Sequence, residues 1–361
     1  MSDPTPPPSA DAIQSFVRDY YGKQLASSAD LATNACCASG APAPWIADAL
    51  ANVHPDVEAR FYGCGFPIPH ALTGATVVDL GCGTGRDVFV LAQMAGPEGV
   101  VHGVDMTAEQ LDLARATEAW HAQRFGFPEP NTRFHRGFIE DLRDVGLADA
   151  SVDVVVSNCV VNLSPRKDLV LTEVARVLRT GGELYLSDVV VDRRLPEHVQ
   201  RDPVLYAECL GGALYEADFL HLAKGLGFTD PRVVTRAPIV IQSPEVAGKI
   251  GPARFSSVTY RLFKLPGLDP QCEDYGQVAT YRGGISGAET LFWLDDHHAF
   301  ERGRPERVCR NTAAMLNATR FAPFFDVTVP GEHYGAFPCD PTLAARHYAE
   351  AQASAGPGAC C

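Results

Sequence analysis

The sequence predicts a doubly wound α/β domain built on a parallel sheet. In the centre of the chain, apolar runs of strand length alternate with amphipathic segments of helix length, a pattern typical of parallel strands joined by helices. The 361 residues exceed what one hydrophobic core usually needs, so we expect attached units. The expected parts are an N-terminal helical cap (1–69), the sheet domain (70–245), a smaller C-terminal α+β domain (246–345) and a flexible tail ending in cysteines (346–361).

In the N-terminal cap, residues 11–25 carry apolar side chains at helical spacing and predict a helix. A second short helix is predicted for residues 45–53. A stretch of small residues between them contains Cys36, and the segment after them, "YGCG", places Cys64 between two glycines. We interpret this region as a cap and not as a core.

The sheet domain begins with a strand, a glycine turn and a helix in residues 75–96, and residues 99–120 repeat strand and helix. Buried strands are predicted within residues 151–163 and 181–191, with a helix at 166–178 between them. Helices are expected on both faces of this sheet. Ligands bind such sheets at the carboxyl ends of the strands, so site residues are expected there.

The C-terminal domain has a weaker pattern. Residues 256–265, 275–284 and 320–329 are predicted to be strands of a small α+β unit, and residues 306–321 one amphipathic helix.

The charge of the chain excludes some classes of partner. Forty-four acidic against 30 basic side chains give a net charge of −14, which repels phosphate backbones and anionic lipid. The first residues have no basic start, and no run of about 18 apolar residues occurs. We therefore expect a cytoplasmic monomer with neither nucleic-acid nor membrane partners.

Eleven cysteines are present, an odd number. In a reducing compartment a structural disulfide network is not expected. The chain has no CxxC pair and no histidine at zinc-finger spacing from any cysteine, which disfavours a local zinc site. Any shared cysteine site must therefore be assembled by the fold.

The cofactor motif is "VVDLGCGTGRD", in which Gly81, Gly83 and Gly85 follow a strand and open a helix. Glycines let the backbone turn sharply and approach a ligand closely. The spacing, with Asp79 before it, differs from the dinucleotide pattern G-x-G-x-x-G and suits a ligand without a pyrophosphate. We expect S-adenosylmethionine; the alternative is a generic glycine-rich turn.

Two further strand ends support this interpretation. Asp105 ends the second strand, where its carboxylate can accept both ribose hydroxyls, while Met106 would cover the adenine and Ile139 with Glu140 would line its edge. Together these signals predict a class I methyltransferase fold, a Rossmann-like doubly wound sheet. The predicted cofactor-binding residues are Tyr62, Asp79, Gly81, Gly83, Thr84, Gly85, Arg86, Asp105, Met106, Gln110, Ile139, Glu140 and Asn158.

The fourth predicted strand brings Asn158 and Cys159 to the edge of the same pocket, close to the expected position of the methyl group. Many methyltransferases carry a group here that orients or deprotonates the acceptor. A thiolate at this place is instead a ligand for a soft atom.

At this point the sequence strongly resembles the arsenite S-adenosylmethionine methyltransferases over nearly the whole chain. The motifs that carry the resemblance are "TNAC" (33–36), "YGCG" (62–65), "DLGCGTGRD" (79–87), "GVDMT" (103–107), "VVSNCVVNL" (155–163), "GGELYLSDV" (181–189), "ECLGGALY" (208–215), "RFSSVTYRLFK" (254–264) and "GGISG" (283–287).

The resemblance implies that Cys64, Cys159 and Cys209 hold trivalent arsenic and that Cys36 takes part in earlier capture or in redox steps. It also implies substrate delivery as a thiol conjugate, a thiol reductant such as thioredoxin or glutathione, and a role in arsenic detoxification. The sequence departs from the simplest pattern because Cys37 adjoins Cys36, so either could be the working thiol, or both could chelate.

Arsenic chemistry explains a thiol after the fourth strand. Trivalent arsenic prefers three sulfur ligands in a pyramid, which leaves its lone pair pointing outward to attack the sulfonium methyl group. Soft thiolates from distant segments could build that pyramid. The arsenic carries no proton, so a general base has no task.

The remaining candidates receive simpler interpretations. Cys82 is expected to pack beneath the glycine turn. Cys272, Cys309 and Cys339 are interpreted as incidental, and Cys360 and Cys361 as spare thiols in the tail, with arsenite capture as the alternative. The segment with Asp295, Asp296, His297 and His298 is interpreted as a solvated face without a metal.

Two other functions remain open from the sequence. One is methyl transfer to carbon or oxygen of a small organic acceptor, which would use the same cofactor pocket. The other is a thiol-rich protein that binds a soft metalloid without turnover, for which cofactor binding would be dispensable.

Overall fold

The computed structural model describes residues 10–24, 33 and 41–338. Cys36, Cys37, Cys339, Cys360, Cys361 and the predicted tail (346–361) lie outside these residues. None of the described helices is long and apolar enough to cross a membrane.

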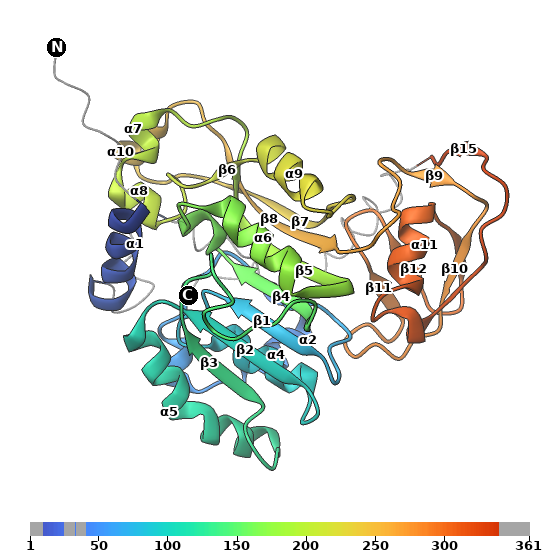
Figure 1. Cartoon of the computed structure of the whole chain (residues 1–361), viewed down its shortest axis with the longest axis horizontal. Coiled ribbons are helices and arrows are strands. Elements are labelled where there is room, and N and C mark those ends of the chain that lie inside the picture. Colours follow the sequence, from blue (N-terminus) through green and yellow to red (C-terminus); the bar gives the residue numbers. More distant parts are fainter. Residues whose placement is uncertain (1–9, 25–32, 34–40, 339–361) are drawn as a thin grey trace.

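An eight-stranded sheet forms the centre of the molecule, in the order β3-β2-β1-β4-β5-β8-β7, with β6 paired to β5 (Figure 1). Strands β1 to β5 pair in parallel, as predicted. The order reverses between β1 and β4, which creates the kind of crevice where such sheets bind ligands. The strands are β1 Thr76–Leu80, β2 Val100–Asp105, β3 Thr132–Arg136, β4 Val152–Asn158, β5 Leu178–Val191, β6 Leu214–Tyr215, β7 Arg232–Ile239 and β8 Phe255–Phe263.

The prediction for residues 256–265 was right about the strand and wrong about its place. This strand, β8, lies in the main sheet, antiparallel to both β5 and β7, and not in the smaller C-terminal unit. Eight of its nine residues are buried, as expected for a strand with neighbours on both edges and cover on both faces. The predicted boundary at residue 246 therefore cuts through the main sheet.

Helices cover both faces of the sheet, as the alternation of strands and helices predicted. Neighbouring β1 residues Val77 and Val78 belong to opposite apolar clusters, because successive side chains of a strand point to opposite faces. Helices α6 and α9 pack on the Val78 side, and α2, α4 and α5 on the Val77 side. These helices are α2 Pro44–Leu50, α4 Arg86–Ala95, α5 Ala108–Phe125, α6 Lys167–Val177 and α9 Glu216–Gly225.

Short helices gather beside the carboxyl ends of β4 and β5. Helix α1 and the π-helical turn η1 lie next to α8, and Tyr21 Oη donates to the Ala207 carbonyl at 2.8 Å (Figure 1). These elements are α1 Ala10–Asp19, η1 Tyr20–Gln24, α3 Pro55–Glu58, η4 Val161–Leu163, α7 Glu197–Gln200, α8 Pro203–Ala207 and α10 Pro244–Ile250.

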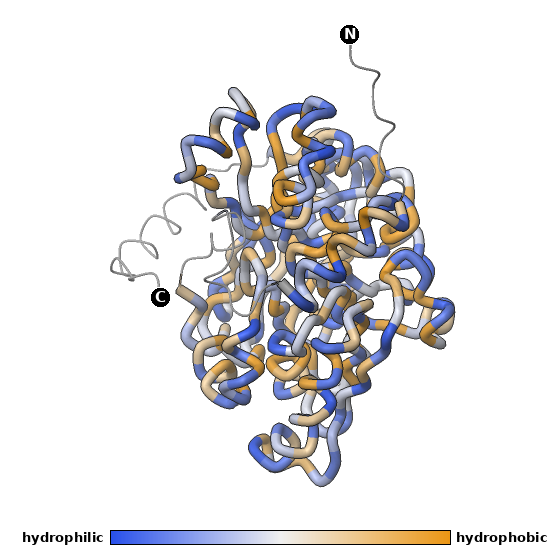
Figure 2. The backbone as a smooth tube through the Cα atoms, turned by 90° about the vertical axis from the view of Figure 1, so that its left-hand side faces the viewer, coloured by the Kyte–Doolittle hydropathy of each residue, from blue (hydrophilic) through white to orange (hydrophobic). Residues whose placement is uncertain are grey.

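The C-terminal unit lies at one end of the main sheet, apart from α1 (Figure 1). It has an apolar cluster of its own that includes Tyr281, Phe292 and Phe321. Seen from the left-hand side of Figure 1, the molecule as a whole carries hydrophilic segments at its outer loops (Figure 2). Its elements are β9 Glu273–Asp274, β10 Val278–Tyr281, β11 Leu291–Trp293, β12 Ala299–Glu301, β13 Pro305–Arg307, α11 Arg310–Asn317, η5 Ala322–Phe324, β14 Phe325–Val327 and β15 Gly335–Ala336.

Buried charges join this unit to the main sheet. Glu183 of β5 is fully buried and pairs with Arg261 of β8 and with Arg320 of the C-terminal unit. Arg261 also donates to the Leu294 carbonyl at 2.7 Å. A buried carboxylate needs such partners because an uncompensated charge in the interior is costly.

The segment from Asp295 to His298 is not the solvated face that we expected. Asp295 is 1% exposed, accepts from Arg232 Nη1 at 3.0 Å and lies 2.8 Å from His298 Nδ1. The pKa of Asp295 is lowered despite its burial, chiefly by the charge and hydrogen bond of His298 and by Arg232. The sequence did not reveal this because Arg232 comes from β7, more than sixty residues earlier.

Candidate active site

The glycine turn after β1 lines a pocket at the carboxyl ends of β1, β2 and β4. Gly81 and Gly83 have φ values of 66° and 53°, in the left-handed region that glycine tolerates best. A Cβ atom on Gly81 would lie 2.2 Å from a methyl carbon of Val160. The turn therefore requires glycine at position 81 both for its conformation and for the close approach of β4.

Asp105 fixes the same turn from the end of β2. Its carboxylate accepts hydrogen bonds from the backbone amides of Gly83, at 2.9 Å, and Thr107, at 2.8 Å. Burial raises the pKa of Asp105, and these hydrogen bonds act in the opposite direction. The Thr107 side chain and the Met106 amide also donate to this carboxylate, and its acceptance of ribose hydroxyls stays a prediction.

The pocket is strongly acidic. Its described lining contains the carboxylates of Asp79, Asp87, Asp105 and Glu140 and one basic side chain, Arg60. Burial, followed by the charge of Asp87, raises the pKa of Asp79 well above its ordinary value. Such a cavity favours a ligand that carries positive charge, and S-adenosylmethionine carries a sulfonium and an ammonium group.

Most of the residues predicted to bind the cofactor line this pocket, namely Tyr62, Asp79, Gly81, Gly83, Thr84, Asp105, Met106, Gln110, Ile139, Glu140 and Asn158. Two do not. Gly85, with φ 87°, precedes the first residue of α4. Arg86 is buried against Asp87, with Nη2 2.8 Å from Oδ1, and its guanidinium stacks over Phe61.

The lining also includes residues that the sequence did not single out. Gln14 and Tyr21 come from α1 and η1, and Phe138 follows β3. Gln14 donates to Glu140 at 3.2 Å, and Gln110 donates to the Tyr21 carbonyl at 3.1 Å. The amphipathic pattern of residues 11–25 predicted a helix but could not reveal that this helix covers the pocket.

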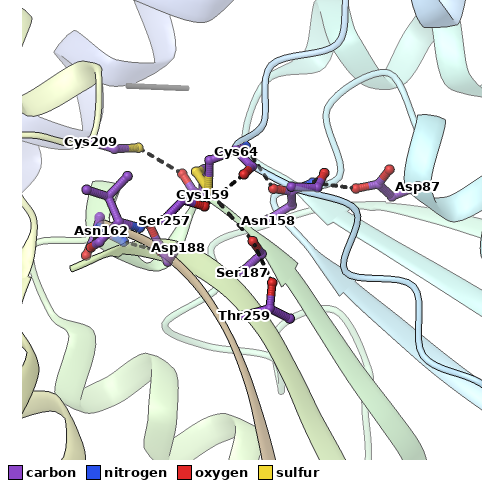
Figure 3. The surroundings of a disulfide bond; sticks show 12 residues. Cys64, Asp87, Asn158, Cys159, Asn162, Ser187, Asp188, Cys209, Ser257 and Thr259 are labelled. Carbon is purple, nitrogen blue, oxygen red and sulfur yellow. Dashed lines mark hydrogen bonds between the residues drawn. A yellow bond between two sulfur atoms is a disulfide. The ribbon is translucent and has the colours of Figure 1, made fainter. Parts of the chain in front are cut away.

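The three predicted arsenic ligands converge beside this pocket (Figure 3). Cys64 and Cys159 are joined by a disulfide bond, and the Cys209 thiol donates to the Cys159 carbonyl at 3.1 Å. The Sγ atoms of Cys159 and Cys209 lie within 4.8 Å of each other and of an Asp188 carboxylate oxygen. All three cysteines are almost fully buried.

The disulfide differs from the three thiolates expected from the sequence. It links residues 95 positions apart, with 5.9 Å between their Cα atoms. Two sulfur atoms gathered to share one metalloid lie near each other, and their oxidation joins them in a disulfide. The spacing of the cysteines in the sequence could not indicate this pairing.

The backbone at two of these cysteines is unusual. Cys159 and Cys209 have φ values of 55° and 64°, the left-handed conformation that residues with a Cβ atom rarely adopt. The Cys159 amide donates to the Ser187 carbonyl at 2.8 Å and holds this conformation at the end of β4. Left-handed residues are enriched at functional sites because the surrounding structure must enforce them.

Asn158 ties the Cys64 loop to the cofactor pocket. Its side-chain oxygen accepts from the Cys64 amide at 3.1 Å, and its Nδ2 donates to the Gly65 carbonyl at 3.0 Å and to Asp87 at 2.8 Å. A Cβ atom on Gly63 would lie 2.8 Å from the Asn158 amide nitrogen. The glycines around Cys64 therefore let this loop come close to β4.

Two ionisable groups lie beside Cys209 that the sequence analysis missed. Asp188, in the last residues of β5 before Val191, accepts from Asn162 Nδ2 at 2.7 Å, and burial raises its pKa to about 7. Burial lowers the pKa of Lys167 to about 8, while the charges of Asp188 and Cys209 act in the opposite direction. The available signal was a carboxylate within the otherwise apolar run of β5.

Comparison with known proteins assigns the family. Residues 72–227 match the family model of a methyltransferase domain, and residues 275–361 match that of the arsenite methyltransferase C-terminal domain. An arsenite methyltransferase of Aquipseudomonas alcaligenes is 56% identical over 322 residues, which is 89% of this chain and 92% of that protein. The chain belongs to the arsenite methyltransferase family.

Other arsenite methyltransferases agree with this assignment. The one from Mus musculus is 45% identical over 88% of this chain and 84% of its own length. The crystal structure of an arsenic(III) S-adenosylmethionine methyltransferase from Chlamydomonas reinhardtii is 48% identical, with a TM-score of 0.79, and covers 82% of this chain and 100% of that one. The predicted class I methyltransferase fold with a C-terminal domain is thereby confirmed.

Proposed function

We propose that this protein transfers methyl groups from S-adenosylmethionine to trivalent arsenic held by the thiolates of Cys64, Cys159 and Cys209. The observation that carries the proposal is the convergence of these three buried sulfurs at the edge of an acidic pocket lined by Asp79 and Asp105. All three sulfurs come from one chain, so a single copy suffices.

The chain's residues act mainly by positioning. Bound S-adenosylmethionine supplies an electrophilic methyl carbon on a sulfonium. Arsenic on three thiolates would present its lone pair to that carbon, and an As–C bond would replace the S–C bond, whose electron pair would remain on the departing sulfur. Arsenic is oxidised by two electrons in this step, and two of its cysteine ligands would return these electrons by leaving as a disulfide. No proton is transferred, so Cys159 stands where other methyltransferases need a base. Holding the reactants in attack geometry can contribute roughly 7–11 kcal/mol.

Substrate loading is proposed to occur by thiol exchange. An arsenic–thiol conjugate would pass its arsenic to three cysteines and release three small thiols, which leave with the cysteine protons. Lys167, whose amine interacts with the Cys209 thiol, favours the thiolate form because opposite charges stabilise it.

A thiol reductant is proposed as co-substrate. The disulfide between Cys64 and Cys159 must become two thiols before both can ligate arsenic. Two equivalents of a small thiol such as glutathione, or one reduced dithiol such as that of thioredoxin, would reduce it and leave as a disulfide. This requirement places the enzyme in a reducing compartment, and we propose the cytoplasm.

Cys36 is proposed to act before the first methylation. Thr33, three residues earlier, donates its backbone amide to Glu208 at 2.5 Å, and Glu208 directly precedes Cys209. Tyr20 Oη donates to the same carboxylate at 2.6 Å. These hydrogen bonds hold Thr33, the first residue of the "TNAC" segment, beside the residue that precedes Cys209. This position of Thr33 supports capture of arsenite or redox exchange by Cys36.

The deciding experiment incubates purified protein with arsenite, glutathione and methyl-labelled S-adenosylmethionine. Labelled methylarsenic species are expected, and their absence would defeat the proposal. Asp105→Ala separates catalysis from sequestration, because it should abolish methylation and leave arsenite binding intact. Methyl transfer to a small organic acceptor that tolerates Cys159→Ser would instead support the alternative methyltransferase.

A further inference from the structure

A second pair of thiols lies in the C-terminal unit, at the other end of the molecule from α1 (Figure 1). Cys272 directly precedes β9, and Cys309 caps the N-terminus of α11. Cys309 is fully buried, whereas Cys272 is partly exposed. Strand β9 packs against α11, which brings Cys272, just before β9, beside the cap of α11, and the Cys272 side chain interacts with the Cys309 thiol. Neither belongs to the arsenic site, and the sequence analysis interpreted both as incidental.

Cys309 is surrounded by groups that stabilise a thiolate. Its sulfur accepts from the Thr312 backbone amide at 3.4 Å and from Arg232 Nη2 at 3.8 Å, and lies 3.2 Å from Thr312 Oγ1. A guanidinium and a helix N-terminus both favour negative charge. The hydrogen bond from Cys272, followed by the charge of Arg232 and the Thr312 contacts, lowers the pKa of Cys309 to about 5.

Arg232 is held in place for this contact. Its guanidinium pairs with Asp230 at 2.6 Å and with Asp295 at 3.0 Å, and its Nη1 lies 3.3 Å from His298 Nδ1. Because these partners fix the guanidinium, the positive charge beside Cys309 needs no rearrangement when the sulfur ionises. Cys82 provides a contrast, since burial raises the pKa of that thiol well above its ordinary value.

We propose that Cys272 and Cys309 form a second, redox-active thiol pair that small disulfides of the glutathione type oxidise to an intramolecular disulfide. Thr312 and Arg232 occupy contacts around the buried Cys309 sulfur. The partly exposed Cys272 is therefore the thiol that an external disulfide reaches, and Cys309 is the internal nucleophile.

The exchange balances in two steps. The Cys272 sulfur attacks the external disulfide, one small thiolate leaves, and the Cys272 proton passes to it. The Cys309 thiolate then attacks the Cys272 sulfur of the mixed disulfide and displaces a second small thiolate, which takes a proton from solvent. Overall, two cysteines are oxidised and one small disulfide is reduced to two thiols; excess glutathione reverses both steps.

The test equilibrates the full-length protein in buffers of varied reduced-to-oxidised glutathione ratio, traps thiols by acid and alkylation, and maps disulfides by mass spectrometry. A peptide pair joined through Cys272 and Cys309 is expected to rise reversibly with oxidised glutathione, whether or not arsenite is methylated. If both cysteines remain fully alkylated while Cys64 and Cys159 are oxidised, the proposal is wrong. This measurement needs no variant, so misfolding cannot obscure it.

Variants then test the order of attack. Cys309→Ser should leave Cys272 carrying glutathione as a stable mixed disulfide, whereas Cys272→Ser should leave Cys309 reduced. Cys82→Ser is the matched control and should leave the internal disulfide unchanged. Glutathione on Cys309 in the Cys272→Ser variant would overturn the assigned order. Protection of both thiols by phenylarsenous acid without oxidation by glutathione disulfide would show a metalloid site and contradict the redox proposal.

Discussion

The side-chain oxygen of Asn158 accepts a hydrogen bond from the backbone amide of Cys64 at 3.1 Å. Asn158 also donates to Asp87, which lines the cofactor pocket. One side chain thus sets the Cys64 loop relative to the cofactor, and small displacements between reacting groups can cost much of the rate.

Asn158→Ala should therefore reduce methylation more than it reduces binding of either ligand. Loss of a residue that orients a ligand typically costs about 10- to 100-fold, and we expect kcat to fall by that amount in a single-turnover assay. Asn52→Ala, at an amide that only bridges Asp48 and Gln93, is the control. Unchanged kcat in Asn158→Ala would contradict this role.

Replacement of any one of Cys64, Cys159 and Cys209 by serine should lower the rate of methylation of a singly methylated arsenical by at least about 100-fold. A hydroxyl has the size of a thiol but is a poor ligand for soft arsenic. The product is measured by chromatography coupled to arsenic detection. Cys272→Ser, in the C-terminal unit and outside the arsenic site, should retain activity; a fully active Cys209→Ser variant would be incompatible with the three-sulfur site.

Cys36→Ser should slow the first methylation more than later ones. A thiol that captures inorganic arsenite is not needed once a methyl group has replaced one ligand position. Rates with arsenite and with methylarsonous acid are compared in the same preparation, and Cys37→Ser, measured alongside, shows which of the two adjacent cysteines is the working thiol. Equal losses at every step would argue against an early role for Cys36.

Asp188 should make stability depend on pH in a specific direction. Its folded-state pKa is raised to about 7 by burial, whereas an unfolded aspartate titrates near roughly 4. Between roughly pH 4 and pH 7 the folded protein keeps a proton on Asp188 that the unfolded protein has released. The contribution of Asp188 to the stability of the fold is therefore fully present below the lower pH, and it is lost as the pH rises to about 7.

The measurement compares the free energy of unfolding of the native protein with that of Asp188→Asn, from roughly pH 4 to about pH 7. The native protein should lose up to about 1.4 kcal/mol more per pH unit than the variant. Parallel pH profiles would show that Asp188 is ionised in the folded protein throughout this range.

The main sheet was predictable because its signals are local. Apolar runs placed β1, β2, β4 and β5, and the glycine turn with Asp105 placed the pocket. The position of β8 was not predictable in the same way, since the pattern of residues 256–265 shows a strand but not its neighbours. The pairing of β8 with β5 depends on tertiary packing between segments that are distant in the sequence.

The candidate site shows the same division. Cys64, Cys159 and Cys209 were found through motifs and a family resemblance. We missed Asp188, Lys167 and the pocket-lining Tyr21, because their importance arises from contacts between distant parts of the chain. The Cys272–Cys309 pair was dismissed for a similar reason: 37 residues separate the two cysteines, and Arg232 comes from β7.

X-ray absorption at the arsenic edge, recorded on reduced protein loaded with one equivalent of arsenite, examines the three-sulfur centre most directly. Three sulfur neighbours and no oxygen are expected in the native protein, with one sulfur lost in Cys209→Ser. An arsenic atom that keeps oxygen ligands in the native protein, or the same three sulfurs in all of Cys64→Ser, Cys159→Ser and Cys209→Ser, would contradict the proposed mechanism.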